Sequence, residues 1–237
     1  MKLVTWNMGC GSARTGYRKH HDEAWAYLIE QLQPDVALVQ EAVVKKLMGA
    51  ERDYTVAVCD LAPRIDAGAA VLVRRAFPAE PVLAPLKAQE TYIAAARVTI
   101  PTGSFVAASI HVYPGKFYKE ALLSLSGNLG PAFADEPAVV AGDFNAARHY
   151  DEVYGRKLCG GFFEAMEAAG FHEAHWKLHG KEAQSFWGRQ AKEKYQDDHF
   201  FVTGGWAARV KSCTVVDNEI VRRVSDHGPV VLELDVG

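Results

Sequence analysis

The first forty residues hold the feature that most constrains the fold of this chain: a strand, a helix and a second strand in direct succession. Residues 2–6 form a short apolar run, and residues 36–39 form another that suits a buried strand. Between them, apolar side chains recur at helical spacing over residues 22–33, with Asp22 as the expected N-cap and Pro34 just beyond the end. A crossover of this kind joins parallel strands and is right-handed.

Polar side chains follow both of these strands. Asn7 comes directly after the first strand, and Glu41 stands just beyond the second. Parallel strands place their carboxyl ends at the same edge of a sheet, which is where open α/β sheets commonly bind ligands. We therefore expect Asn7 and Glu41 to face one crevice.

The rest of the chain is predicted to be mostly strands, with two further helices. Short apolar runs bounded by Gly or Pro indicate strands at residues 69–74, 94–100, 105–111, 139–140, 200–202, 210–216 and 230–236. Helical spacing indicates helices at residues 118–125 and 162–169. No internal repeat, low-complexity tract or linker composition divides the chain, so residues 1–237 are expected to form a single domain.

Charge, cysteine spacing and hydropathy disfavour several classes of protein. The net charge is −3 and the pI is about 6.3, so binding of a polyanion would need a local basic patch or a metal ion. The four cysteines, Cys10, Cys59, Cys159 and Cys213, stand far apart with no CxxC pair, which disfavours a zinc cluster. The sequence contains neither a signal-peptide pattern nor a long apolar span, so a cytoplasmic protein without membrane contact is expected.

Six apolar runs along the chain have one feature in common: each lies directly next to an ionisable or amide side chain. These side chains are Asn7, Glu41, His111, Asp143 with Asn145, Asp198, and Asp226 with His227. Carboxylate and amide oxygens are the ligands that a hard cation needs, and imidazoles move protons or hold anions. The set therefore indicates a metal-assisted active site, provided that the fold brings its members together.

Each of these features has a simpler interpretation when it is taken alone. Asp143 and Asn145 are typical of a turn after a strand, and Glu41 could be an exposed polar cap. The segment 226–229 could be only a loop, and His111 could be a buried histidine with satisfied hydrogen bonds. Only their joint occurrence on different strands favours a catalytic site over these simpler structural roles.

The segments TWN, QE, SIH, GDFN, DDHFFV and SDH, in this order and across almost the whole chain, resemble the endonuclease/exonuclease/phosphatase superfamily. The resemblance implies a four-layer α/β/β/α sandwich of two mixed sheets flanked by helices, with the active site at one end of the sheets. It also implies metal-dependent hydrolysis of phosphoester bonds.

The resemblance further implies a metal site. Glu41 would be the principal Mg²⁺ ligand, with Asn7 and Asp226 holding the ion directly or through its water, and Mn²⁺ is a possible substitute. Mg²⁺ commonly takes only one or two protein carboxylates besides water and a substrate phosphate.

The same resemblance assigns the remaining residues to the phosphate and the attacking water. Asn145 and His111 would bond the phosphate, and Asp143 would orient or deprotonate the water. His227, steered by Asp198, would share that duty or stabilise the pentacovalent state. The residues leave open whether Asp143 or His227 is the base; the resemblance to deoxyribonuclease I favours His227.

His111 bears on the substrate, because apurinic endonucleases of the superfamily carry Tyr at this place, whereas deoxyribonuclease I, sphingomyelinases and 5-phosphatases carry His. The nearby Tyr113 leaves a slipped alignment open. DNA or RNA is the expected substrate, and no obligate protein partner is evident. Cations that could contact it are Arg14, Arg18, Lys19, Arg64, Lys116, Lys119 and Arg148, and aromatic side chains that could stack on bases are Tyr17, Tyr113, Phe117, Tyr118 and Trp187.

Two alternatives remain. The first is a phosphatase or phosphodiesterase for a small or lipid-derived phosphoester, although no apolar loop or basic amphipathic helix suits a bilayer. The second is a binding module that has lost its chemistry, which the competent residue type at every matched position disfavours.

Overall fold

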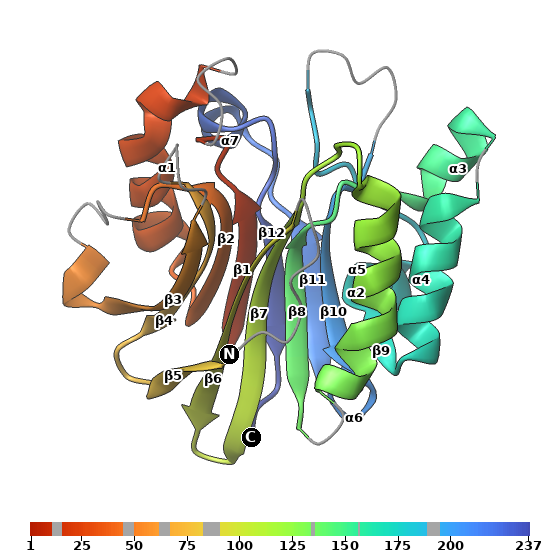
Figure 1. The fold of residues 1–237 in the computed structure, drawn as a ribbon. Helices are drawn as coiled ribbons and strands as arrows, with labels where there is room; N and C mark the ends of the chain where they lie inside the picture. Colours follow the sequence, from red (N-terminus) through yellow and green to blue (C-terminus); the bar gives the residue numbers. More distant parts are fainter. Residues whose placement is uncertain are drawn as a thin grey trace.

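Two six-stranded β-sheets lie face to face, and helices cover the outer face of each (Figure 1). The structure is a computed structural model that describes residues 1–10, 16–44, 50–61, 67–82, 91–133, 136–155, 157–188 and 195–237. The layers run helix, sheet, sheet, helix, which confirms the predicted α/β/β/α sandwich.

The first sheet combines the two ends of the chain. Its strands in spatial order are β11 (Val210–Val215), β12 (Val230–Leu234), β1 (Lys2–Asn7), β2 (Val36–Ala42), β4 (Gly68–Arg74) and β3 (Tyr54–Leu61). β1 and β2 are parallel, as the strand–helix–strand pattern predicts, and the other neighbours are antiparallel.

The second sheet is built from the middle of the chain. Its strands in spatial order are β5 (Ala79–Val82), β6 (Thr91–Ile100), β7 (Gly103–Val112), β8 (Ala138–Asp143), β10 (Asp198–Thr203) and β9 (Phe171–Glu173). It also contains a single parallel pair, β7 and β8. Each sheet is therefore mixed.

Helices pack on both outer faces. The first sheet is covered by α1 (His21–Ala26), its π-helical continuation η2 (Tyr27–Leu32) and α7 (Glu219–Val224), and the second by α2 (Tyr118–Ala132) and α4 (Leu158–Ala168). The shorter helices are η1 (Tyr17–His20), η3 (Ala50–Arg52), α3 (Arg148–Tyr154), α5 (Ala174–His179) and α6 (Gly204–Ala207). Among the described helices, none combines the length and the apolar character needed to span a membrane.

The core lies in three apolar layers. Leu38 and Val71 of the first sheet meet Ala107 and Phe200 of the second between the sheets. Outside the first sheet, Trp25 of α1 belongs to a separate buried cluster, and α2 and α4 build a third outside the second sheet. Strands that are buried on both faces have continuous apolar sequences. Their positions can therefore be predicted from the sequence.

Several boundaries differ from the prediction. Asp22 is not an N-cap, because η1 runs directly into α1 and places His20 at the cap; Asp22 instead lies in the first turn. Its negative charge still suits a helix N-terminus. The predicted helix at 118–125 continues to Ala132, and the one at 162–169 already begins at Leu158. Short elements such as β9, α5 and α6 carry too few residues to show a periodicity.

A buried ion pair joins β9, β10 and α5. Glu173 ends β9 and accepts hydrogen bonds from the backbone N–H groups of His175 (3.3 Å) and Trp176 in the first turn of α5. Its Oε1 also lies 3.4 Å from Nδ1 of His199 on β10. Burial raises the pKa of Glu173, but the hydrogen bond and charge of His199 outweigh burial and lower that pKa overall.

Glu173→Ala is therefore expected to lower the free energy of unfolding by about 3 kcal/mol, because it removes a helix cap and one partner of a buried pair. Urea denaturation measures the change. Glu164→Ala, at an exposed position of α4, is the matched control and should be neutral. Equal midpoints for Glu173→Ala and the wild type would contradict a stabilising role for this pair.

Candidate active site

The ends of the strands that carry most of the predicted polar side chains lie at one end of the sandwich, away from both termini (Figure 1). Strand register explains this. Asn7 pairs with Gln40 at the end of the parallel strands β1 and β2, and His111 pairs with Asp143 at the end of β7 and β8. Asp198 begins β10 directly opposite Asp143.

Asp143 is the centre of the cluster. Its Oδ2 accepts a hydrogen bond from Asn7 Nδ2 at 2.8 Å and lies 3.7 Å from His111 Nε2 and 3.8 Å from His227 Nε2. Glu41 joins from the first sheet, with Oε1 3.4 Å from Asn7 Nδ2 and 3.7 Å from His111 Nε2. Residues from both sheets thus surround one point. His111, not Tyr113, occupies this position, because the ring of Tyr113 is 55% exposed.

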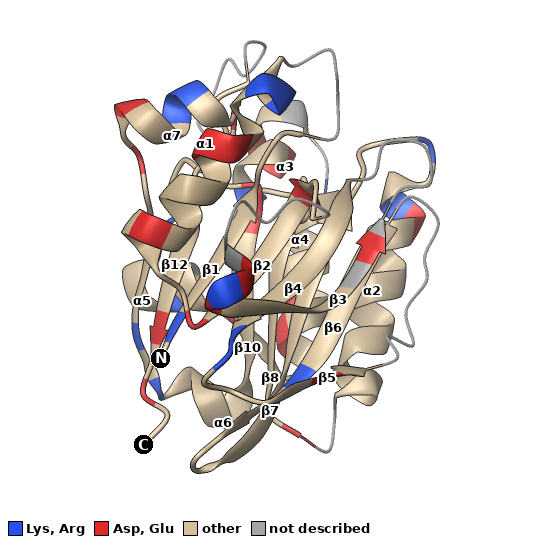
Figure 2. Ribbon diagram, turned by 90° about the vertical axis from the view of Figure 1, so that its left-hand side faces the viewer, with Lys and Arg blue, Asp and Glu red and all other residues tan. Residues whose placement is uncertain are grey.

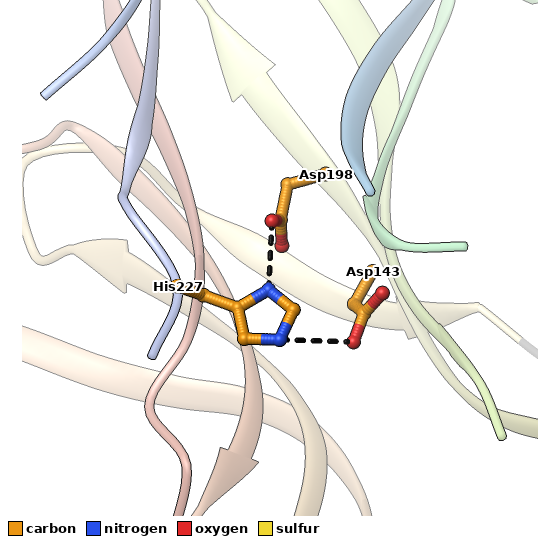
Figure 3. A group of neighbouring side chains, drawn as sticks. All are labelled: Asp143, Asp198 and His227. Carbon is orange, nitrogen blue, oxygen red and sulfur yellow. Dashed lines mark hydrogen bonds and ion pairs between the residues drawn. The ribbon is translucent and has the colours of Figure 1, made fainter. Parts of the chain in front are cut away.

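His227 is held by Asp198 (Figure 3). Its Nδ1 donates to Asp198 Oδ2 at 2.8 Å, and the opposite ring nitrogen, Nε2, points toward Asp143. Ser185 donates a second hydrogen bond to Asp198 Oδ2 at 2.7 Å. The carboxylate therefore fixes the ring orientation and favours the tautomer that carries the proton on Nδ1.

The segment that begins at Ser185 holds the loop that carries His227, and sequence reasoning missed this role. The carbonyl oxygen of Ser185 accepts from Gly228 N at 2.7 Å, and Trp187 N donates to the Asp226 carbonyl oxygen at 2.7 Å. The ring of Phe186 lies 4.8 Å from the imidazole of His227. The sequence signal is weak, because Ser-Phe-Trp lies in a loop and lacks a motif.

Gln40, which belongs to the QE segment, is a second residue to which the sequence analysis assigned no role of its own. Its buried side chain donates to Ser109 Oγ on the opposite sheet at 2.9 Å and to Thr5 Oγ1 at 3.1 Å. Ser109 in turn donates to the Val39 carbonyl oxygen. These contacts tie the two sheets together just below the site, so they fix the separation of Glu41 and Asp143.

The loop after β8 is tightly shaped. A Cβ at Gly142 would lie 1.8 Å from the Ile110 carbonyl oxygen, so only glycine allows β8 to approach β7 there. Asn145 adopts a left-handed conformation (φ 50°), and its backbone N–H donates to Asp143 Oδ1 at 2.8 Å. Tyr118 donates to the Asn145 carbonyl oxygen at 2.6 Å. The pair of residues is thus both a turn and a fixed part of the site.

Glu41, Asp226 and Asn7 form the oxygen-rich side of the site. A Cβ at Gly9 (φ 63°) would meet Asp226 Oδ1 at 3.3 Å, which places this carboxylate beside the end of β1. Burial raises the pKa of Asp226, and the negative charges of Glu41 and Asp143 add to the rise. The Asn7 amide donates to Glu41 and Asp143 and accepts from Gly9 N at 2.9 Å, so it links the two carboxylates.

This donor set fits a hard divalent cation. The described part of the site brings the carboxylates of Glu41, Asp143, Asp198 and Asp226 close to the imidazoles of His111 and His227. Such an excess of negative charge is costly unless a cation or protons compensate it. Oxygen donors are those that Mg²⁺ and Mn²⁺ prefer.

Protons compensate part of the negative charge around Asp143 and His227. Burial raises the pKa of Asp143, and His227 opposes the rise. Burial by itself lowers the pKa of His227, but the charges of Asp198 and Asp143 outweigh it and raise that pKa well above its ordinary value. A cation bound nearby would oppose this rise, because it disfavours the imidazolium.

Asp143, Asp198 and His227 also have the spacing of a metal site, since one ligand atom of each lies within 4.8 Å of the others. The short hydrogen bond from His227 Nδ1 to Asp198 already occupies these two groups with each other. Glu41 and Asp226 do not belong to this group of three, and both residues are partly exposed.

The predicted cations do not form one basic patch on the described residues that Figure 2 shows. Arg14 and Arg64 lie outside the described residues. The Arg148 guanidinium is packed 3.8 Å from the ring of Phe163 and 4.3 Å from that of Trp176, so it stabilises α3 against α4 and α5 and is not a surface contact. On the side shown in Figure 2, Lys and Arg alternate with Asp and Glu over the described ribbon and build no continuous basic face.

Aromatic rings do border the mouth. The ring of Tyr92 stacks on His111 at 6.1 Å, and that of Tyr113 meets the same imidazole edge-on at 6.4 Å. Phe117 is 36% exposed, and Lys116 Nζ lies 5.2 Å above its ring. Trp187 is packed beside Arg222, with the guanidinium 4.9 Å from its ring.

The fold is shared by solved structures of low sequence identity. An AP endonuclease from Archaeoglobus fulgidus aligns with a TM-score of 0.71 at 19% identity and covers 100% of both chains. The 3'-5' exonuclease NExo from Neisseria meningitidis gives a TM-score of 0.70 at 20% identity, covering 99% of this chain and 100% of its own. A humanized D. rerio TDP2 gives 0.71 at 17% identity, with 98% and 97% covered.

Sequence comparison identifies the family. No curated protein matches the chain by sequence. The sequence model of the Endonuclease/Exonuclease/phosphatase family matches residues 4–227, a span that contains Asn7, Glu41 and His227. The chain therefore belongs to the endonuclease/exonuclease/phosphatase family, whose members hydrolyse phosphoester bonds.

Proposed function

We propose that this protein is a divalent-metal-dependent phosphodiesterase that cleaves DNA or RNA, and that residues 1–237 act as one catalytic domain. The observation that carries the proposal is the meeting of His111, His227 and Glu41 around Asp143, with both imidazole Nε2 atoms within 3.8 Å of Asp143 Oδ2. Carboxylates and imidazoles from the ends of β2, β7 and β8 and from the loop before β12 would form one reaction site.

His227 is the general base of the proposed reaction. Because Asp198 binds its Nδ1–H, the lone pair of Nε2 faces the site and takes a proton from the attacking water. Asp143, between the two imidazoles, orients that water through Oδ2 and stabilises the imidazolium that forms.

His111 and Asn145 bind the phosphate. The Asn145 side chain donates one N–H to the Val112 carbonyl oxygen at 3.0 Å, and its second N–H would donate to a phosphoryl oxygen. The preorganised donors need no rearrangement when charge grows on the phosphoryl oxygens, which is the main source of such stabilisation.

Glu41 and Asp226 would hold the divalent ion, with Asn7 orienting Glu41 or adding an oxygen ligand. When bound, the ion polarises the phosphoryl group and stabilises the departing alkoxide. The oxygen-rich chemistry of this donor set supports these roles for Asn7, Glu41 and Asp226.

Two observations support nucleic acid as the substrate. One structure of the same fold is that of the 3' phosphatase NExo from Neisseria bound to a product DNA hairpin, with a TM-score of 0.67 and 19% identity. Tyr113 and Phe117 expose aromatic rings at the mouth, and such rings stack on unpaired bases.

Chelation is expected to abolish activity. With Mg²⁺ or Mn²⁺ the protein should nick plasmid DNA or cleave single-stranded DNA or RNA. EDTA should reduce the rate to background, because the charge of the ion stabilises the departing alkoxide. Full activity in EDTA would contradict the metal requirement.

The same assay separates the alternatives. An abasic duplex, bis-p-nitrophenyl phosphate, sphingomyelin and an inositol phosphate complete the panel. Turnover of the small esters without any nucleic acid would favour a small-molecule phosphodiesterase, and turnover of sphingomyelin alone would favour a lipid-derived substrate. Preferred cleavage at the abasic site would contradict the inference drawn from His111.

A further inference from the structure

A cavity of about 400 Å³ opens directly beside the proposed phosphate site. It lies between the loop that follows β7 and the helices α3 and α4. Asn145 belongs both to the cavity wall and to the catalytic loop. Other residues of the wall are Pro114, Tyr118, Tyr150, Asp151, Leu158 and Cys159. Its volume is in the range of small-molecule pockets, about 300–1,000 Å³.

The polar groups of this wall are already engaged in ways that keep the cavity rigid. Asp151 Oδ1 accepts from Leu158 N and Cys159 N, both at 3.1 Å, and Oδ2 accepts from Gly160 N, so the carboxylate caps α4. The Tyr118 hydroxyl donates to the Asn145 carbonyl oxygen, and that of Tyr150 donates to Asp197 at 3.1 Å. The cavity is therefore preformed and mechanically joined to Asn145.

The chemistry of the wall selects its occupant. Asp151 is the only charged side chain among the described residues of the wall. Burial raises the pKa of Cys159 to about 11, so its thiol is neutral. A phosphate or carboxylate would meet a carboxylate and no cation of this wall. Two tyrosine rings, Leu158 and a thiol instead suit a flat, uncharged ring that can also donate to Asp151 or Asn145.

We propose that this cavity is a subsite for the base of a nucleotide adjoining the scissile phosphate, an inference that rests on the proposed nuclease function. The base would pack against Tyr118 and Leu158 while its phosphate reaches Asn145 and His111. Because the occupant must be an unstacked base, the substrate class is single-stranded or locally unpaired nucleic acid.

The test compares two octamers with identical phosphates. One is octathymidylate, and the other replaces every thymidine by a baseless tetrahydrofuran residue. The wild type should cleave octathymidylate with the higher kcat/KM. The quantity compared is the kcat/KM for octathymidylate divided by that for the baseless octamer. Leu158→Trp, which fills the cavity, should reduce this ratio by roughly tenfold or more, which corresponds to the loss of one base–aromatic contact. Leu123→Trp makes the same change at a position of α2 that is 54% exposed and should leave the ratio unchanged.

Further measurements keep the result decisive. Thermal unfolding shows whether Leu158→Trp is folded; if it is not, Leu158→Ala, which removes the packing surface, should shift the ratio in the same direction. An unchanged ratio in a folded Leu158 variant overturns the subsite, and an equal loss on both octamers assigns Leu158 a structural role only.

The same variants are compared for equilibrium binding of fluorescently labelled octamers in EDTA. If the wild type cleaves neither octamer and no nucleic acid of the panel, the proposed nuclease function fails. A loss of octathymidylate binding in the Leu158 variant then still supports the base subsite, whereas equal binding of both octamers overturns it.

Discussion

His227→Ala is expected to lower kcat by on the order of a thousandfold, within the range of about 10²–10⁴ for general acid–base catalysis. The substitution removes the Nε2 lone pair that faces Asp143 and leaves Asp198 without its 2.8 Å partner. The substrate for this measurement is whichever member of the panel the wild type cleaves fastest. Circular dichroism should show an unchanged fold.

The controls for His227→Ala separate chemistry from packing. His172→Ala makes the same change on β9, away from the site, and should retain near-normal turnover. Asp143→Ala is expected to lose at least about a hundredfold, and the double variant little more than the worse single one, because residues that act on one step are not additive. A folded Asp143→Ala protein with normal turnover would remove Asp143 from the mechanism.

Glu41→Gln is expected to lose at least about a hundredfold in rate, because it removes a charge that holds the ion which stabilises the transition state. The shape of the side chain is kept, and with it the contact to Asn7. Raising the concentration of Mg²⁺ or Mn²⁺ should recover part of the rate. The measurement is activity against metal concentration, with calorimetric titration of the metal alone.

The comparison variant is Glu30→Gln, at an exposed position of η2, which should bind metal and turn over substrate as the wild type does. Equal metal affinity in Glu41→Gln and the wild type would place the ion elsewhere. In that case the spacing of Asp143, Asp198 and His227 would make those residues the next candidates.

The contacts of Ser185 and Gln40 are part of the site that the sequence did not predict. The polar ends of the buried strands were predicted because an apolar run followed by Asn, Glu, His or Asp is visible locally. The roles of Ser185 and Gln40 were not predicted. Ser185 lies in a loop without a motif, and nothing in the sequence indicates that the Gln40 side chain binds the opposite sheet. Both act through partners on distant parts of the chain, which no local pattern reveals.

Arg148 is a residue whose predicted contact with nucleic acid the structure does not support. As a cation shortly after GDFN it was predicted to contact nucleic acid, yet the rings of Phe163 and Trp176 enclose its guanidinium. Those rings come from α4 and α5, so the outcome depends on how three helices pack. Charge in the sequence does not say which face of a helix it occupies.

The sequence by itself determined the positions of most buried strands, because hydrophobic periodicity is a property of neighbouring residues. Its short motifs at the strand ends, through their resemblance to a known family, implied the two-sheet architecture and the residue types of the site. Only the tertiary structure decided which of those side chains touch, how Asp198 and Ser185 fix the ring of His227, and where the cavity beside Asn145 opens. Distances between residues far apart in the chain follow from side-chain packing and hydrogen bonding between layers, and these become defined only when the whole core is formed.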